Sequence, residues 1–232
     1  MGSVNILAID TSGKSVSCGV MKDGVMRAAM YANSGLTHSE TLMPSIDDAL
    51  ERAGIGISDV DLIACVTGPG SFTGVRIGVC AAKGLAHPGS IPCLPVDSLE
   101  AIAWNLRMSD AVVCPMLDAR RHEVYAAAFR CGKGCVTRLL DDSAEPLDAF
   151  LDKLPGDAAL IFAGDGSLSY REQVVQRFPE ALFAPENLNW PESGAICEIA
   201  RENAGRAVSG SELCALYLRA PQAVREKEAR NG

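Results

Sequence analysis

The order of apolar segments along the chain limits the possible folds more than any other feature of the sequence. Three short strand-like runs, separated by turn residues, are followed by a helical pattern, a buried strand and a second helix. A similar, more ragged order starts again near residue 112. In the first copy we expect strands at 4–11, 16–21, 24–31, 61–67 and 91–96, and helices at 38–53, 73–86 and 98–104. In the second we expect strands at 112–117, 123–130, 135–140, 159–163 and 181–184, and helices at 147–154, 170–178 and 193–203.

Two successive copies of a β-β-β-α-β-α order are typical of a duplicated RNase H-like lobe. The order resembles the plan of actin, the sugar kinases and Hsp70. The sequence therefore predicts an α/β fold of two RNase H-like lobes in the actin/sugar-kinase/Hsp70 (ASKHA) superfamily. We assign residues 1–107 to the first lobe and residues 108–232 to a second, more variable lobe, with a C-terminal tail that can return to the first lobe.

Charge and hydropathy narrow the class of protein. The 232 residues include 21 basic and 29 acidic side chains, which gives a formal net charge of −8. Because neutralisation of phosphates supplies most of the affinity for nucleic acids, this balance argues against unaided nucleic-acid binding. No segment has the length of a membrane helix, and the start of the chain, Val4–Asp10, is too short and too soon polar for a signal peptide. We therefore expect a cytoplasmic protein that does not enter a membrane.

The cysteines and histidines offer no local catalytic or metal motif. The nine cysteines are odd in number and most lie in apolar runs, which argues against a disulfide framework. Cys131 and Cys135 have the spacing of half a zinc site, but no second pair of ligands follows. His38, His87 and His122 each lack another His or Cys three or four residues away. We predict no metal site and no catalytic residue, although nucleophile pairs that assemble only in space stay open.

A glycine-rich run from Gly68 to Gly78 follows an expected strand and opens an expected helix. It is neither a Walker A loop, because no Lys-Ser/Thr follows its last glycine, nor a G-x-G-x-x-G motif, nor a nucleophile elbow. Small residues recur every four positions, at Gly74, Gly78, Ala82 and Ala86. Each mid-helix glycine costs roughly 1 kcal/mol relative to alanine, so another part of the structure must approach this face closely. That neighbour is either backbone of the same lobe or a helix of another subunit, and we favour the second.

The segment Asp10-Thr11-Ser12-Gly13 is a candidate for ligand binding. An acid at a strand end, followed by hydroxyls and a glycine, can hold Mg²⁺ and present N–H groups to a phosphate. The same residues can also form an ordinary hairpin that caps its own backbone. The corresponding turn of the second lobe, Asp118–Glu123, has no glycine, so side chains would stand where a phosphate must approach backbone. ATP hydrolysis by this chain alone is therefore not expected.

Several segments together resemble a known family. They are Ala8–Ser12, His38–Glu40, Gly68–Gly78, Asp118–Tyr125 and Tyr217–Pro221. The chain resembles the TsaB (YeaZ) family over nearly its whole length. The resemblance implies a non-catalytic paralogue of TsaD, the protein that transfers a threonylcarbamoyl group to the adenosine next to the anticodon of tRNA. In TsaD a helix carries a pair of metal-binding histidines, and at the comparable place this chain has Pro95–Ala101, which contains none.

The family resemblance also implies partners and sites. It implies a scaffold and dimerisation subunit that binds TsaD, binds TsaE through the TsaB–TsaD pair, forms a homodimer when alone and contacts tRNA only indirectly. It implies a pairing surface on the two helices His38–Ala53 and Thr73–Ala86. The candidate interface residues are His38, Leu42, Ile46, Gly74, Val75, Gly78 and Ala82. No cofactor of its own is expected, but ATP or ADP could lie at the boundary with a partner, with Asp10, Thr11, Ser12 and Arg120 as candidate contacts.

Two other functions stay open at this point. An autonomous actin-like ATPase or kinase would use Asp10, Thr11 and Ser12. A peptidase is suggested by older names for the family, but the sequence has neither a metal-binding histidine pair nor a local nucleophile motif.

Overall fold

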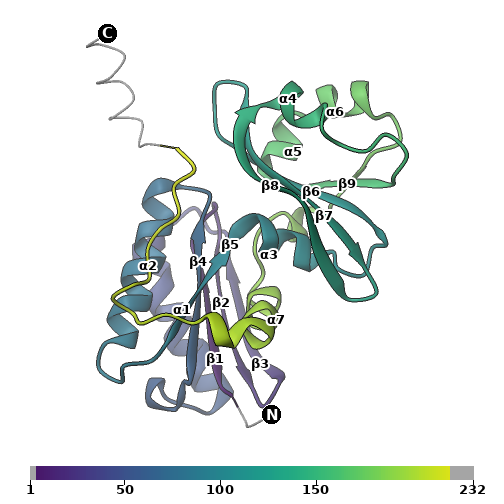
Figure 1. Ribbon diagram of the computed structural model, residues 1–232. Coiled ribbons are helices and arrows are strands. Elements are labelled where there is room, and N and C mark those ends of the chain that lie inside the picture. The colour runs from purple at the N-terminus through teal and green to yellow at the C-terminus, as the bar shows by residue number, and fades with distance from the viewer. Residues whose placement is uncertain (1–3, 220–232) are drawn as a thin grey trace, which may run out of the picture.

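The computed structural model describes residues 4–219, which form two lobes, each built on a five-stranded sheet (Figure 1). The strand order is β3-β2-β1-β4-β5 in the first sheet and β8-β7-β6-β9-β10 in the second. In both sheets the first three strands of the lobe pair antiparallel and the last two pair parallel. The two lobes therefore share one topology, and the predicted duplication is confirmed. The last two residues of the Tyr217–Pro221 motif lie outside the described residues.

The predicted elements are present, with small shifts at their ends. In the first lobe they are β1 (Ile6–Asp10), β2 (Val16–Lys22), β3 (Val25–Ala32), α1 (His38–Ala53), β4 (Leu62–Gly68), α2 (Phe72–Ala86), β5 (Cys93–Asp97) and α3 (Ser98–Asn105). They continue with β6 (Ala111–Asp118), β7 (Glu123–Gly132), β8 (Cys135–Pro146), α4 (Leu147–Leu151), β9 (Leu160–Ala163), α5 (Asp165–Ser169), α6 (Arg171–Arg177), β10 (Leu182–Phe183) and α7 (Ser193–Asn203). Helix α5 was not predicted, and β8 extends six residues beyond its expected end.

Helices cover both faces of the first sheet. Alternate side chains of β1 point to opposite faces, as the two-residue period of a strand requires: Leu7 and Ile9 join the core under α1 and α2, and Ile6 and Ala8 join the core under α3 and α7. Helix α1 begins after Thr37, whose backbone N–H donates to the Glu40 carboxylate at 3.0 Å, and ends at Gly54 in the left-handed conformation. This three-layer packing places the ends of β1 and β4 beside the second lobe (Figure 1).

Helix α7 packs on the first lobe, although the division at residue 108 assigned it to the second. Its apolar side chains, among them Ile196 and Ile199, are buried against Ile6, Met21 and Leu62 of the first sheet. Helix α3 belongs to the first lobe in chain order but also packs against the second sheet, where Ile102 is buried. The assignment of α7 was wrong because chain order does not reveal which sheet a helix covers when both sheets offer an apolar face.

The segment after α7 runs back along the first lobe to the boundary between the lobes (Figure 1). Val208 pairs with Cys93 of β5, and the backbone N–H of Leu216 donates to the carbonyl of Thr67 at 2.8 Å. Arg219 then forms an ion pair with Glu123 of β7. We call residues 207–219 the C-terminal strap. None of the helices formed by residues 4–219 has the length and apolar character needed to cross a membrane.

Candidate functional site

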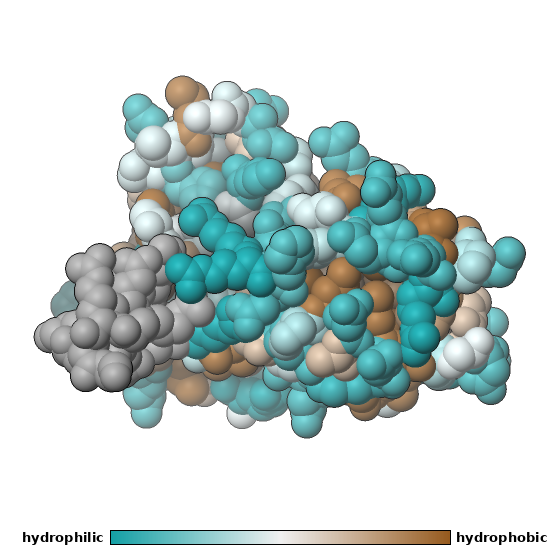
Figure 2. Space-filling model, turned by 90° about the horizontal axis from the view of Figure 1, so that it is seen from above, coloured by the Kyte–Doolittle hydropathy of each residue, from teal (hydrophilic) through white to brown (hydrophobic). Residues whose placement is uncertain are grey.

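A cavity of about 700 Å³ lies between the two lobes. It is lined by the hairpin after β1, the loop before α2, the turn after β6, Trp190 and the end of the C-terminal strap. From above, the molecular surface is mainly hydrophilic, with apolar side chains gathered in smaller patches (Figure 2). Its lining shows that two sequence-predicted candidates, the first hairpin and the turn Asp118–Glu123, come together at this cavity.

The four predicted nucleotide contacts occupy two different environments. Ser12 and Arg120 line the cavity, whereas the Asp10 and Thr11 side chains are fully buried below it. Asp10 Oδ1 accepts a hydrogen bond from the Ser12 N–H at 2.8 Å, and Asp10 Oδ2 has no partner among the described residues. Burial raises the pKa of the Asp10 carboxyl to about 7, because desolvation disfavours the charged form. The structure does not bring the four side chains together around one ligand position.

Trp190 covers the first hairpin, a contact that no pattern in the sequence indicated. A methyl group added at Gly13 would lie 2.5 Å from Cζ3 of the indole ring, so the ring rests directly on this glycine. The polar groups beside it are used within the chain: the Ser12 carbonyl accepts from the Ser71 N–H at 2.7 Å, and the Gly13 carbonyl accepts from His38 Nε2 at 2.9 Å.

The turn after β6 is built without glycine, as its sequence shows, and its backbone is unusual. Arg120, Arg121 and His122 all have positive φ, at 63°, 56° and 61°. Asp118 stabilises the turn, because its Oδ1 accepts from the Arg120 N–H at 2.8 Å and from the Tyr170 hydroxyl at 3.2 Å. Three side chains therefore project from the segment where a phosphate would need bare backbone.

The small-residue face of α2 packs inside its own lobe. A methyl group at Gly78 would lie 2.5 Å from Thr11 Oγ1, and one at Gly74 would lie within 3.0 Å of the Thr11 carbonyl oxygen. Thr11 Oγ1 also donates to the Gly74 carbonyl at 2.7 Å. The interpretation that these glycines make room for a helix of another subunit was wrong. They make room for Thr11 at the end of β1.

Most of the predicted interface residues are inaccessible because they also pack inside the first lobe. Leu42 and Ile46 of α1, and Gly74, Val75, Gly78 and Ala82 of α2, are buried in the first lobe. His38 is half-buried and bonds to Gly13. The prediction that these side chains contact a partner was therefore wrong. The periodicity that marked them is that of the core-facing side of each helix. The exposed side of the same two helices carries other residues: Ser39, Glu40, Met43 and Asp47 on α1, and Thr73, Arg76 and Cys80 on α2.

The C-terminal strap contacts α2 where it faces the cavity. Arg76 Nε donates to the Tyr217 hydroxyl at 2.7 Å, and the Arg76 guanidinium lies 3.7 Å from the centroid of the Phe72 ring. The Phe72 and Tyr217 rings are 5.2 Å apart, both partly exposed. Further along α2, Lys83 donates to the carbonyls of Ser211 and Leu213, at 3.0 Å each. The strap thus connects α2 to the second lobe through Arg219.

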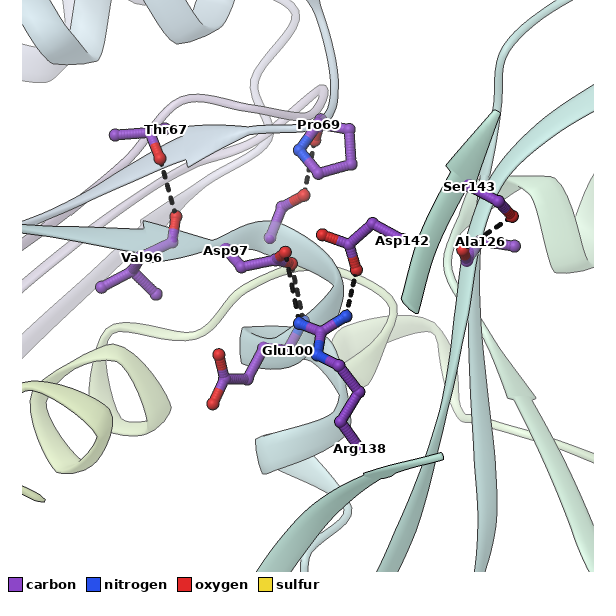
Figure 3. Close-up of polar contacts among 10 residues, drawn as sticks. Thr67, Pro69, Val96, Asp97, Glu100, Ala126, Arg138, Asp142 and Ser143 are labelled. Carbon is purple, nitrogen blue, oxygen red and sulfur yellow. Dashed lines mark hydrogen bonds and ion pairs between the residues drawn. The ribbon is translucent and has the colours of Figure 1, made fainter. Parts of the chain in front are cut away.

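A charged cluster joins the lobes beside the start of α3. In Figure 3 the Arg138 side chain of β8 lies between Asp97 and Asp142, with Glu100 nearby. Burial and the facing Asp142 carboxyl raise the pKa of Asp97 well above its usual range, while Arg138 and the Glu100 N–H act in the opposite direction. Within residues 4–219 no three His, Cys, Asp or Glu side chains gather as a metal site.

Comparison with known proteins identifies the family. Residues 33–220 match the family model described as TsaD: tRNA N6-adenosine threonylcarbamoyltransferase. The chain is 32% identical over 172 residues to the tRNA threonylcarbamoyladenosine biosynthesis protein TsaB of Bacillus subtilis, which covers 74% of this chain and 75% of that protein. It is 35% identical over 130 residues to the Escherichia coli protein of the same name, and this match spans about half of either chain, 55% of each.

Solved structures agree with this relationship. The structure of YeaZ from Pseudomonas aeruginosa superposes with a TM-score of 0.79 at 27% identity, covering 93% of this chain and 100% of that one. A second structure, described as an uncharacterized protein with similarity to peptidase YEAZ from the same organism, gives a TM-score of 0.82 at the same identity and coverage. Since the family model and the B. subtilis relative both match most of its length, the chain belongs to the TsaB family of TsaD-related proteins.

Proposed function

We propose that this protein is a non-catalytic subunit in the biosynthesis of threonylcarbamoyladenosine in tRNA, and that it binds and supports TsaD. Its relatives in B. subtilis and E. coli are named for this biosynthesis. The structure of the first hairpin is the observation that best supports a non-catalytic role. The carbonyls of Ser12 and Gly13 accept hydrogen bonds from within the chain, and Gly13 lies under Trp190. An ATPase, kinase or peptidase would need reactive groups open to a substrate, and the Asp10 carboxyl is fully buried.

The proposed surface for TsaD is the exposed side of α1 and α2. The two helices lie side by side on one face of the first sheet, so their outer sides form one continuous surface (Figure 1). Met43 is 40% exposed on α1, and Cys80 is exposed on α2. Apolar side chains that remain accessible on neighbouring helices suit helix-to-helix pairing, in which a second pair of helices buries them. A second copy of the chain, in the absence of TsaD, would use the same surface, and TsaE would bind the completed pair.

Co-purification with TsaD tests this surface. We expect Met43→Asp and Cys80→Asp to abolish co-purification and to lower tRNA threonylcarbamoylation by the reconstituted proteins, because a carboxylate would be buried without a partner. Leu139→Asp is the matched control, since Leu139 is 45% exposed on β8 of the second lobe. The surface is assigned wrongly if both α1 and α2 variants still bind TsaD as the control does.

A nucleotide at the boundary with the partner is a further part of the proposal. Ser12 and Arg120 line the cavity and are its candidate contacts, whereas Asp10 and Thr11 lie too deep to touch a ligand there. Calorimetric titration of ATP and ADP into the mixed proteins tests it. We expect the titration to release heat of binding and Arg120→Ala to lower the affinity. A titration without heat would contradict nucleotide binding at this boundary.

A further inference from the structure

The C-terminal strap is part of the first lobe as far as Leu216. Val208 and Cys93 of β5 exchange two backbone hydrogen bonds of 2.8 Å each. Leu213 is buried in the core under α1 and α2. The Leu216 N–H then donates to the Thr67 carbonyl at 2.8 Å, at the end of β4. Up to this residue the strap therefore moves with the first lobe.

The strap then crosses to the second lobe. Arg219 and Glu123 form an ion pair, and their side chains are only 13% and 28% exposed. Because partial burial keeps water from the pair, its charges interact more strongly than those of a surface pair. The Glu123 backbone closes the turn after β6, since its carbonyl accepts from the Ala119 N–H at 3.0 Å and its N–H donates to the Arg120 carbonyl at 3.2 Å. The ion pair therefore holds the turn that lines the cavity.

The boundary is held differently beside α3. There Leu99 and Ile102 are buried in one core with Phe129 of the second sheet. A second ion pair, between Arg138 and Asp97, crosses the boundary at the start of α3. The chain itself passes from the first lobe to the second directly after this helix. A buried apolar core with a chain crossing suits a hinge, whereas the ion pair at the end of the strap can break without exposing a core.

The end of the strap is also tied to the outer side of α2. Arg76 is exposed there, and its Nε donates to the Tyr217 hydroxyl at 2.7 Å. The Tyr217 ring lies 5.2 Å from the ring of Phe72, at the start of α2. Tyr217 directly follows Leu216 and is two residues from Arg219. The position of the Arg76 side chain is therefore linked to that of the ion pair through a few residues of extended chain.

We propose that the C-terminal strap is a clasp between the lobes. Arg219 keeps the cavity closed by holding Glu123, and the contact of Arg76 with Tyr217 keeps the end of the strap in place for this ion pair. Loss of either contact lets the lobes separate about α3 and opens the cavity to solvent. The inference goes beyond the proposed function, because it concerns the arrangement of the lobes in the isolated chain and needs no TsaD.

Trp190 reports on this opening. Its ring rests on Gly13 of the first lobe, whereas its side chain is buried in the core that contains Phe129 of the second sheet. Separation of the lobes would move Gly13 away from the indole, which is 7% exposed in the closed arrangement. Trp104→Phe leaves Trp190 as the only tryptophan of the chain. This change removes no hydrogen bond, since Trp104 Nε1 has no partner among the described residues.

Acrylamide quenching of Trp190 fluorescence tests the clasp on the purified full chain carrying Trp104→Phe. We expect Arg219→Gln and Glu123→Gln each to raise the quenching constant at least about twofold, because the balance between closed and open lobes shifts towards the open form. Arg177→Gln is the matched control and should change nothing, since the ion pair of Arg177 with Asp152 lies within the second lobe. Unchanged quenching in both clasp variants would overturn the proposal.

Two further variants separate the clasp from a general loosening of the fold. Arg219→Glu combined with Glu123→Arg restores opposite charges and should return the quenching constant to that of the parent chain. A combined variant that is quenched as strongly as the single ones would show that the two side chains do not act as a pair.

Tyr217→Phe tests the link to α2. It keeps the ring beside Phe72 but removes the hydroxyl that accepts from Arg76, so it should also raise the quenching of Trp190. Quenching equal to that of the parent chain would overturn this link. None of these measurements involves TsaD, so this inference and the proposed function fail separately.

Discussion

The Thr11 hydroxyl donates a hydrogen bond to the Gly74 carbonyl at 2.7 Å, and this contact brings the end of β1 against the first turn of α2. The bond crosses 63 residues of sequence and is completely buried. Because Thr11 approaches this closely, Gly74 and Gly78 have no room for a side chain. The glycine-rich run is therefore a packing device of the first lobe, and it sets the position of α2 relative to the cavity.

The first prediction concerns these glycines. Gly74→Ala should destabilise the protein by about 2 kcal/mol, because the new methyl group would overlap the Thr11 carbonyl and force the backbone apart. Gly84→Ala, in the same helix, should stabilise it by about 0.5–1 kcal/mol, since nothing lies within 4 Å of that position and alanine favours helix. Urea denaturation of both variants checks the contrast. Equal effects at the two sites would mean that Thr11 does not crowd α2.

The buried Asp10 carboxyl should make stability depend on pH. Its folded pKa of about 7 lies above the unfolded value near 4, so the folded state binds the proton more tightly. Stability from this group is present below about pH 4 and is lost as the pH rises to about 7, by up to roughly 4 kcal/mol. Asp10→Asn should remove this slope, because an amide does not titrate. Urea denaturation between pH 5 and 8 measures it, and parallel pH profiles for both proteins would contradict the assignment.

Arg138 should be essential to the junction of the lobes. Arg138→Gln leaves Asp97 and Asp142 facing each other without a cation, and we expect a loss of about 3 kcal/mol at pH 8. The loss should be smaller at pH 5, because the raised pKa of Asp97 means that the pair can then share a proton. Adding Asp142→Asn should recover most of the stability at pH 8. A thermal unfolding series at both pH values tests this, and a pH-independent loss would argue against carboxylate repulsion.

The C-terminal strap should contribute to stability through one buried anchor. Leu213 is 1% exposed in the core under α1 and α2, so Leu213→Ala should cost about 3 kcal/mol. Leu216 lies in the same strap and is 41% exposed, so Leu216→Ala should cost less than about 1 kcal/mol. Chemical denaturation compares the two. If both substitutions are equally mild, the strap is not anchored in this core.

Local patterns of the sequence were sufficient to predict most helices and strands and the duplicated topology. Apolar periodicity marked β1, α1 and α2, because strands and helices bury every second residue or one helical stripe whatever their neighbours are. The missing glycine between Asp118 and Glu123 likewise indicated a turn unsuited to phosphate, since bulk at that position is a local property. Helix α5 escaped prediction because its five residues, Asp165–Ser169, are too few to show a helical period.

Only the tertiary structure decided what each marked residue faces. The four-residue spacing of Gly74 and Gly78 is the same whether the neighbour is Thr11 or a second protein, and the assignment of α7 to the second lobe failed in the same way. The Trp190 ring on Gly13 joins positions 177 residues apart in the sequence, so no local pattern could reveal it. Sequence periodicity determined that a close-packed face exists, and long-range packing decided that this chain fills it with its own residues.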